Sequence, residues 1–148
     1  MYKISLIALI TVLMASNQSL LKAQSPTGTI TIKIGTLRNM NGHLLISLFN
    51  KDDAYPDNAD AAFRTKKIKV SKERETVVLN NIPYGEYALV FLHDENDSQE
   101  MDTNMMGIPK EGYGASNNAV NTFSAPKYSE AKFRLNSANT TQSLKVYY

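Results

Sequence analysis

Five residues whose oxygen atoms could bind a cation recur at every second position between residues 94 and 102. They are Asp94, Asn96, Ser98, Glu100 and Asp102. Calcium takes about six to eight oxygen ligands. Short side chains at the first, third and fifth positions of a loop, a carbonyl at the seventh and a carboxylate at the ninth can surround one ion. The pattern therefore predicts a calcium site to which Glu100 contributes its carbonyl oxygen.

The same side chains also allow an interpretation without an ion. Asx residues in loops commonly accept hydrogen bonds from their own backbone, and this interpretation applies to Asp94, Asn96, Asp102 and Asn104. The helix-loop-helix type of calcium loop is excluded, because Gln99 stands where that loop needs glycine and Met105 where it needs glutamate. The other two interpretations, a short calcium loop and a set of Asx turns, both remain open.

The sequence gives little support for catalysis. The chain has 2 histidines and no cysteine, too few for the usual set of nitrogen and sulfur ligands around zinc. Ser116 lacks the strand-Gly-x-Ser-x-Gly-helix surroundings of a hydrolase nucleophile. We therefore expect a protein that is not an enzyme and has no catalytic residue.

A second group of polar and aromatic residues lies in and around the stretch 107–118, which we expect to be an ordered loop. Side chains of these types can hydrogen-bond to a sugar or a peptide and stack on it. The ligand-binding candidates are His93, Tyr113, Ser116, Asn117 and Asn118. The alternative is that the aromatic rings are packing anchors and the amides bond to neighbouring backbone. Met105, Met106 and Ile108 are expected to pack this loop against the end of the fold.

Strands must position these residues, because apolar side chains recur with period two along most of the chain. Ile30, Ile32 and Ile34, for example, alternate with threonine and lysine. About seven short strands separated by turns favour a single all-β domain, an antiparallel β-sandwich with one long ordered loop after His93. The expected core residues are Ile30, Ile32, Ile34, Ile46, Leu48, Leu89, Phe91, Phe133, Leu144 and Val146.

Three local patterns refine this architecture. The stretch 87–92 is apolar on both faces, so this strand is expected at the centre of its sheet, covered on both sides. The pair Asn41-Gly42 between two apolar runs predicts a hairpin turn. The stretch 55–64 predicts a short helical turn capped by Asp57 or Asn58.

The first 23 residues have the features of a secretory signal peptide: Lys3, an apolar run of about 12 residues and a polar end. The apolar run is too short to span a membrane. Cleavage after Ala23 would remove 2 of the 16 basic residues and leave 14 basic against 14 acidic residues. Because this remaining chain is neutral and has no basic run, we expect no nucleic-acid binding and no membrane insertion after cleavage. Because the chain has no cysteine, we expect no lipid anchor. We expect a periplasmic or extracellular protein.

Three segments carry a resemblance to a known family: "GTLRNMNGHLLISLFN" from residue 35, "IPYGEYALVFLHDEN" from residue 82 and "MDTNMMGIPKEGYGASNNA" from residue 101. They resemble the bacterial exported family DUF2141. The resemblance implies a domain over residues 24–148, an immunoglobulin-like or transthyretin-like β-sandwich in the bacterial envelope, and no known reaction. Family members often carry Asn-Gly where this chain has Ser98-Gln99, which implies a weakened calcium site.

The expected function is a non-catalytic binding or accessory module of the bacterial envelope. Its one elaborate segment is a loop rich in glycine, asparagine and tyrosine at one end of a small fold, where such folds commonly present ligands. The partner would be an envelope protein, a peptide or a glycan. The alternative is a structural or assembly protein that contacts another envelope protein through its sheet edges.

Overall fold

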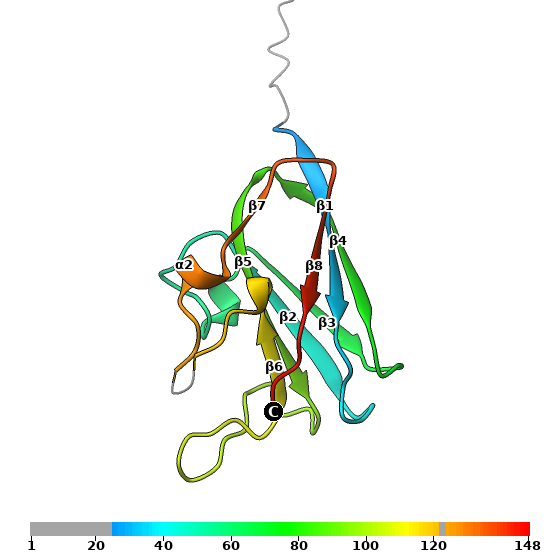
Figure 1. Cartoon of the computed structure of the whole chain (residues 1–148), viewed down its shortest axis with the longest axis vertical. Coiled ribbons are helices and arrows are strands. Elements are labelled where there is room, and N and C mark those ends of the chain that lie inside the picture. The colour runs from blue at the N-terminus through cyan, green and yellow to red at the C-terminus, as the bar shows by residue number, and fades with distance from the viewer. Residues whose placement is uncertain (1–24, 122–123) are drawn as a thin grey trace, which may run out of the picture.

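The computed structural model describes residues 25–121 and 124–148 (Figure 1). The predicted signal peptide, residues 1–23, therefore lies outside the described residues. The described part is mostly β and contains eight strands in two sheets. All-β architecture, as the alternation indicated, is confirmed. No helix in this part of the chain is long and apolar enough to cross a membrane.

Strands account for most of the ordered elements, with three short helical turns between them. The strands are β1 (Thr27–Ile34), β2 (His43–Phe49), β3 (Arg64–Lys69), β4 (Thr76–Pro83), β5 (Gly85–Asp94), β6 (Gly112–Ala115), β7 (Phe133–Leu135) and β8 (Asn139–Leu144). The turns are the 3-10 helices η1 (Ala59–Ala61) and η2 (Ser116–Asn118) and the α-helix α2 (Tyr128–Ala131). Asn58 caps η1 by accepting a hydrogen bond from the Ala61 N–H, as predicted.

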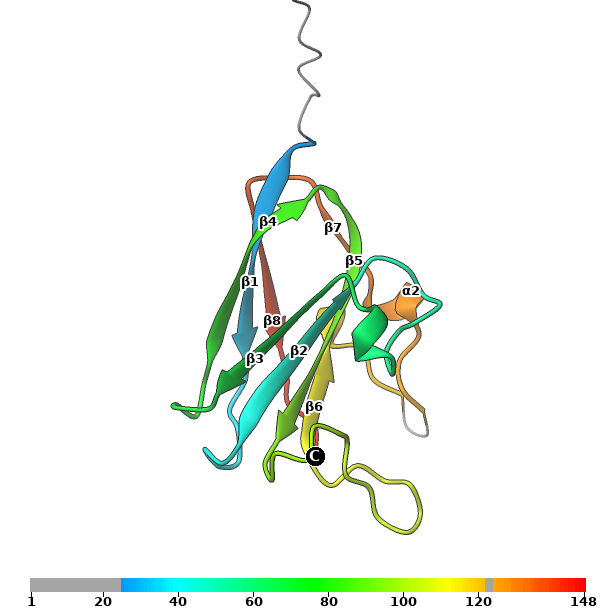
Figure 2. The ribbon, with the colours of Figure 1, turned by 180° about the vertical axis from the view of Figure 1, so that it is seen from behind.

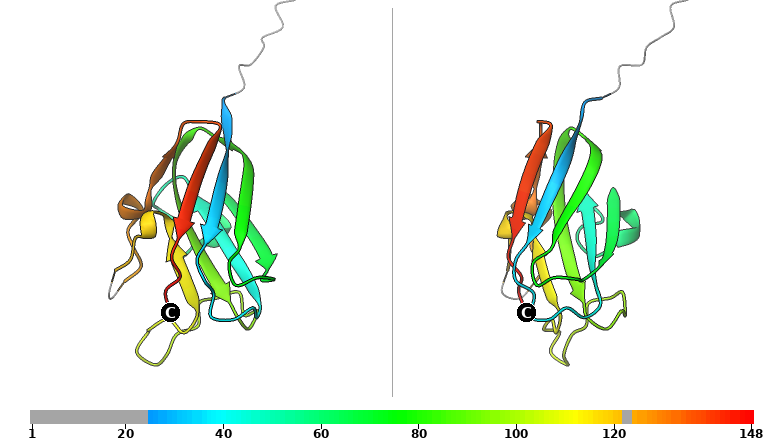
Figure 3. Two further views of the ribbon diagram at one scale, coloured as in Figure 1. Left: turned by 45° about the vertical axis from the view of Figure 1, so that its right-hand side comes forward. Right: turned by 90° about the vertical axis from the view of Figure 1, so that its right-hand side faces the viewer.

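The strands form two layers that are seen from two sides in Figure 3. Sheet A has the order β4-β1-β8, and sheet B has the order β3-β2-β5-β6 with β7 paired to β5. The prediction of an entirely antiparallel fold is wrong, because β1 and β8 are parallel. The estimate of about seven strands missed β6, which lies in the stretch that we expected to be loop.

The hydrophobic core lies between the two sheets. It joins the isoleucines of β1 with Leu44, Ile46 and Leu48 of β2 and with Leu89 and Phe91 of β5. Of the ten predicted core residues, eight are buried, and Phe133 and Val146 are partly buried and pack against the same cluster. Alternation of apolar and polar residues therefore identified the inner faces correctly.

The predicted hairpin at Asn41-Gly42 is wrong. Gly42 has the expected positive φ of 61°, yet β1 belongs to sheet A and β2 to sheet B, so the turn carries the chain from one sheet to the other. The Asn-Gly pair correctly indicated a positive φ in the turn, but it did not indicate which strand pairs with β2.

The prediction for β5 is confirmed. It pairs with β2 on one side and with β6 and β7 on the other, so it is central in sheet B. Its inner face contributes to the core, while Ala88 on its outer face is covered by Tyr55 and α2. Figure 2 shows α2 and the 50–60 segment lying on this outer side.

Candidate functional site

The loop 95–111, which connects β5 to β6, is closed at its base by one buried carboxylate. Glu111 Oε1 accepts a hydrogen bond from the Glu95 N–H at 2.9 Å, and Glu111 Oε2 accepts one from the Asp102 N–H at 3.1 Å. Both bonds draw the chain back onto the start of β6. The sequence did not identify this residue, because its partners lie 9 and 16 positions away.

The predicted calcium ligands are brought together in the first half of this loop. Asp94 is fully buried, and its two carboxylate oxygens accept hydrogen bonds from the N–H groups of Ser98 and Gln99, each at 3.0 Å. Gln99 has a φ of 67°, the conformation that glycine would adopt most easily. The carboxylate of Asp94 thus closes a turn around the segment that follows it.

The other members of the set bond to one another. Asn96 Oδ1 also accepts from the Ser98 N–H at 3.0 Å, and Asn96 Nδ2 donates to Asp102 Oδ2 at 2.7 Å. Ser98 Oγ donates to the carbonyl oxygen of Glu100 at 3.0 Å. The bond from the Ser98 N–H to Asn96 is of the kind that the Asx-turn interpretation predicts, whereas Asp102 accepts from a side chain and not from its own backbone. In the described residues, no group of three or more His, Cys, Asp or Glu side chains is arranged to hold a metal.

We expect the melting temperature in millimolar calcium to equal that in excess chelator, because backbone N–H groups already satisfy the Asp94 carboxylate. An ion at about one hundred times its dissociation constant would instead add about 2.7 kcal/mol to the free energy of unfolding. Thermal melts followed by circular dichroism make this comparison. A melting temperature that is higher in calcium than in chelator, with no such difference in the double variant Asp94→Asn and Asp102→Asn, would establish the calcium interpretation.

His93 is fully buried and joins three segments of the chain. Its Nε2 lies 3.0 Å from the carbonyl oxygen of Asn41, which can only accept, so Nε2 carries the proton in this bond. Its Nδ1 then accepts from the Tyr148 hydroxyl at 3.2 Å. Burial raises the pKa of the Tyr148 hydroxyl above its usual value, which keeps that group a donor. Neither nitrogen of His93 is free to act on a ligand.

Arg38 completes this polar cluster at the end of the fold. Its guanidinium lies 4.4 Å from the centre of the Tyr148 ring and 2.8 Å from Glu95 Oε1. It also donates to the carbonyl oxygen of Lys110 at 2.8 Å. The cluster therefore attaches the segment after β1, the end of β5 and the base of the loop to one another.

Ser116, Asn117 and Asn118 hold the elements around β6 together. Ser116 is buried, and its Oγ accepts from the Leu89 N–H at 2.9 Å and donates to the carbonyl oxygen of Ala131. Asn117 Nδ2 donates to the carbonyl oxygens of Glu130 and Lys132, the residues around the end of α2. Asn118 bonds to the backbone of residues 143 and 145 on the β8 side. These polar groups follow the packing alternative, in which amides bond to backbone.

Tyr113, a further predicted ligand-binding residue, is partly exposed. It belongs to a cross-strand row on the outer face of sheet B, which we call the outer band and which consists of Leu45, Leu92, Tyr113 and Tyr147. All four side chains are partly exposed. The Tyr113 and Tyr147 ring centres are 6.0 Å apart, with a 38° angle between the planes. The corresponding outer positions of β1 are Thr29, Thr31 and Lys33, so sheet A has no such apolar row.

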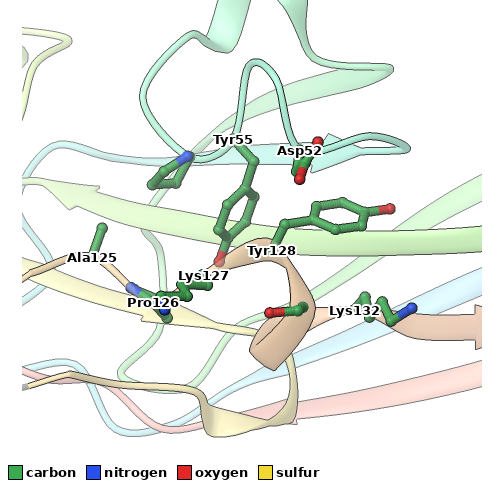
Figure 4. A pocket seen from close by; sticks show the side chains of 9 residues that line it. Asp52, Tyr55, Ala125, Pro126, Lys127, Tyr128 and Lys132 are labelled. Carbon is green, nitrogen blue, oxygen red and sulfur yellow. The ribbon is translucent and has the colours of Figure 1, made fainter.

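A groove of about 570 Å³ lies between the segment after β2 and the segment around α2 and is shown in Figure 4. Tyr55 and Pro56 line it from the segment after β2, and Pro126 and Tyr128 line it from the segment around α2. The Tyr55 ring stands nearly perpendicular to Tyr128, with ring centres 5.7 Å apart. Sequence reasoning missed this groove, because its two walls are about seventy positions apart and meet only through packing on β5.

The prediction that Met105, Met106 and Ile108 pack against the fold is wrong. Their exposed fractions are 105%, 79% and 51%. The segment that carries them projects from the end of the molecule at the bottom of Figures 1 and 2. Thr103 pairs with Pro109, and the Asn104 N–H donates to the carbonyl oxygen of Ile108 at 2.9 Å, so the segment is a small closed hairpin. We call residues 103–109 the loop tip.

Comparison with known proteins adds a family assignment. Residues 32–143 match the family described as uncharacterized protein conserved in bacteria, DUF2141. The match extends from β1 to β8 and includes the whole loop 95–111 with its tip. No curated protein and no solved structure matches the chain. The family match covers most of the chain, and the protein belongs to the DUF2141 family.

Proposed function

We propose that the protein is an exported, non-catalytic binding or accessory module of the bacterial envelope, folded as an immunoglobulin-like or transthyretin-like β-sandwich. It contacts an envelope protein through the loop tip. The observation that carries the proposal is the exposure of three apolar side chains, Met105, Met106 and Ile108, on an ordered hairpin. Exposed apolar groups gathered on one surface commonly mark interaction sites.

The hydrogen bonds of the loop tip support this function, because they hold the tip ready for binding. Asn104 Oδ1 accepts from the N–H groups of Met106 and Ile108 at 2.9 and 3.0 Å. The Gly107 N–H donates to the carbonyl oxygen of Asn104 at 2.9 Å. An ordered segment loses less conformational entropy on binding than a flexible one, so more of the burial energy contributes to affinity.

The chemistry of the loop tip favours a concave apolar surface on another protein. Residues 103–109 carry no charged side chain, and methionine side chains adapt to irregular apolar pockets. Burying one methionine fully is worth about 1.5–3 kcal/mol. The nearest charged residues in sequence are Asp102 and Lys110, of opposite sign, so the flanks offer no net positive charge that would favour an anionic membrane. A peptide or glycan partner would use the outer band, through Tyr113 and Tyr147, instead.

The alternative function, assembly through sheet edges, has less support. β3 is an edge strand with the basic residues Arg64, Lys66, Lys67 and Lys69, and charged side chains on an edge discourage pairing with another chain. The β6 edge is bridged by Tyr147, and the β8 side is bonded to Asn118. These three edges are therefore charged or partly occupied, and the β4 edge of sheet A is the one that this alternative could use.

The experiment introduces a photo-crosslinking amino acid in place of Met105 and, as control, in place of Thr31 on the outer face of sheet A. Both positions are exposed to solvent at least in part, but only Met105 belongs to the loop tip. Each variant is irradiated in cells of the bacterial source, and the envelope fraction is analysed for crosslinked products. Recovery of the protein from that fraction at the mass of residues 24–148 also tests export and cleavage after Ala23.

A further inference from the structure

A hollow of about 540 Å³ lies on sheet A, where β1 and β8 end and β4 begins. In Figure 3 these three strand ends meet toward the bottom of the molecule. Its lining includes the cationic side chains Lys33, Arg74 and Lys145, together with Thr36 and Ser143. The cations come from positions 33, 74 and 145 and meet only because β1 has β4 on one side and β8 on the other.

These three cations lack carboxylate partners. In residues 25–121 and 124–148, Lys33, Arg74 and Lys145 form no ion pair, whereas Lys132 and Arg134 share Glu86 at 3.4 and 3.5 Å. The single acid of the lining is Glu75, which is buried. Three like charges around one hollow repel one another, and an anion between them would relieve that repulsion.

Glu75 stabilises the turn that precedes β4. Its Oε1 accepts hydrogen bonds from the Ser71 N–H at 2.8 Å, the Ser71 hydroxyl at 3.1 Å and the Lys72 N–H at 2.9 Å. With three cations and one carboxylate in its lining, the hollow carries a net positive charge. The mature chain as a whole is neutral, so this positive charge is a local feature.

Arg74 is oriented by a hydrogen bond that leaves its outer edge free. Its Nε donates to Thr36 Oγ1 at 2.9 Å. Its terminal amino groups have no acceptor in the described part of the chain. A guanidinium fixed in this way presents two parallel N–H donors, the geometry that fits two oxygens of a phosphate or sulfate. Thr36 accepts the Arg74 bond and keeps its own hydroxyl proton for a ligand.

We propose that this hollow binds the phosphate or sulfate group of a small polar ligand. Arg74 contacts two oxygens of the group, and Lys33 and Lys145 neutralise its charge from either side. The remainder of the ligand would extend over the polar side chains of the same lining, Asn118 and Ser143. This site is separate from the loop tip and the outer band. If the hollow bound no phosphate or sulfate, the proposed function would therefore be unaffected.

Titration of the folded chain of residues 24–148 with inorganic phosphate, sulfate and chloride at equal ionic strength tests the site, followed by amide chemical shifts in NMR. We expect saturable shifts around Arg74 and Lys145 with phosphate and sulfate but not with chloride. A parallel titration with glucose 6-phosphate and glucose distinguishes a sugar-borne phosphate from the free ion. Tighter binding of glucose 6-phosphate than of inorganic phosphate would show that the site prefers a phosphate attached to a larger molecule over the free ion.

Variants supply the matched control. Arg74→Gln should weaken phosphate binding by about tenfold or more, since a charge-assisted bidentate contact is lost. Lys69→Gln on β3 removes an exposed cation outside the hollow and should leave the dissociation constant unchanged. In low-salt buffer without phosphate, Lys145→Gln should melt no lower than the natural chain, because it relieves like-charge repulsion.

Three results would overturn the proposal. One is a response to chloride as large as the response to phosphate. The second is phosphate binding that survives Arg74→Gln, and the third is binding that Lys69→Gln weakens as much as Arg74→Gln does. A loss of binding confined to Arg74→Gln, with circular dichroism unchanged, supports it.

Discussion

Replacing Gly42 by alanine is expected to remove most of the stability of the folded state. A Cβ at this position would overlap the carbonyl oxygen of Asp94, which is backbone and cannot move aside as a side chain could. Gly42 also has a φ of 61°, a conformation that costs other residues about 1–2 kcal/mol. Strain and overlap together should lower the free energy of unfolding by more than about 4 kcal/mol, a large share of a typical total.

Gly107 provides the matched control for this prediction. It also has a positive φ, 76°, but a Cβ there would meet nothing within 4 Å. Gly107→Ala should therefore cost only the conformational part, about 1–2 kcal/mol. Urea unfolding followed by circular dichroism compares the two variants. Equal losses for both would show that Gly42 does not approach the end of β5 as closely as the structure has it.

Replacing His93 by alanine should cost about 2–4 kcal/mol in the free energy of unfolding. The side chain is fully buried, so its removal leaves a cavity. It also removes the partner of the Asn41 carbonyl oxygen and one of the two partners of the Tyr148 hydroxyl, which still accepts from the Arg38 N–H. The effect is structural, because His93 connects the turn before β2 to the segment after β8.

His43 is the control for His93, and the two differ in burial. His43 is only partly buried and pairs with Asp97 near the surface, where the bond to His43 lowers the pKa of the Asp97 carboxyl. Exposed pairs of this kind contribute little to stability, so His43→Ala should have a much smaller effect than His93→Ala. Guanidinium unfolding of both variants tests this. A larger loss for His43→Ala would contradict the assignment of His93 to the interior.

The sequence predicted the inner faces of the sheets better than it predicted their pairing. Alternation depends only on neighbouring residues, so the core isoleucines of β1 and the double-sided apolar pattern of β5 were recognisable. Pairing depends on which distant strands meet. The parallel contact of β1 with β8 joins the two ends of the domain, and no local pattern indicates it.

In the candidate sites, too, contacts between residues close in sequence were predicted and contacts between distant residues were not. Asx residues accepting from their own backbone were predicted, because Asp94 and Ser98 are four positions apart. The exposure of Met105 was mispredicted, since apolar character favours burial, yet the hairpin bonds of Asn104 direct the tip away from the sheets. The hollow around Arg74 was not predictable, because its cations meet only after β1 pairs with both of its neighbours.

Photo-crosslinking from the loop tip tests the proposed function most directly. We expect a crosslinker at position 105 to yield one defined product with another envelope protein, because the loop tip, which still carries Met106 and Ile108, enters an apolar pocket of that partner. The crosslinker at position 31 should yield none. The product should also weaken when Met106→Ser is added, while Met40→Ser, which changes an exposed methionine outside the tip, should leave it intact. No product from position 105, or the same products from positions 105 and 31, would contradict the proposal.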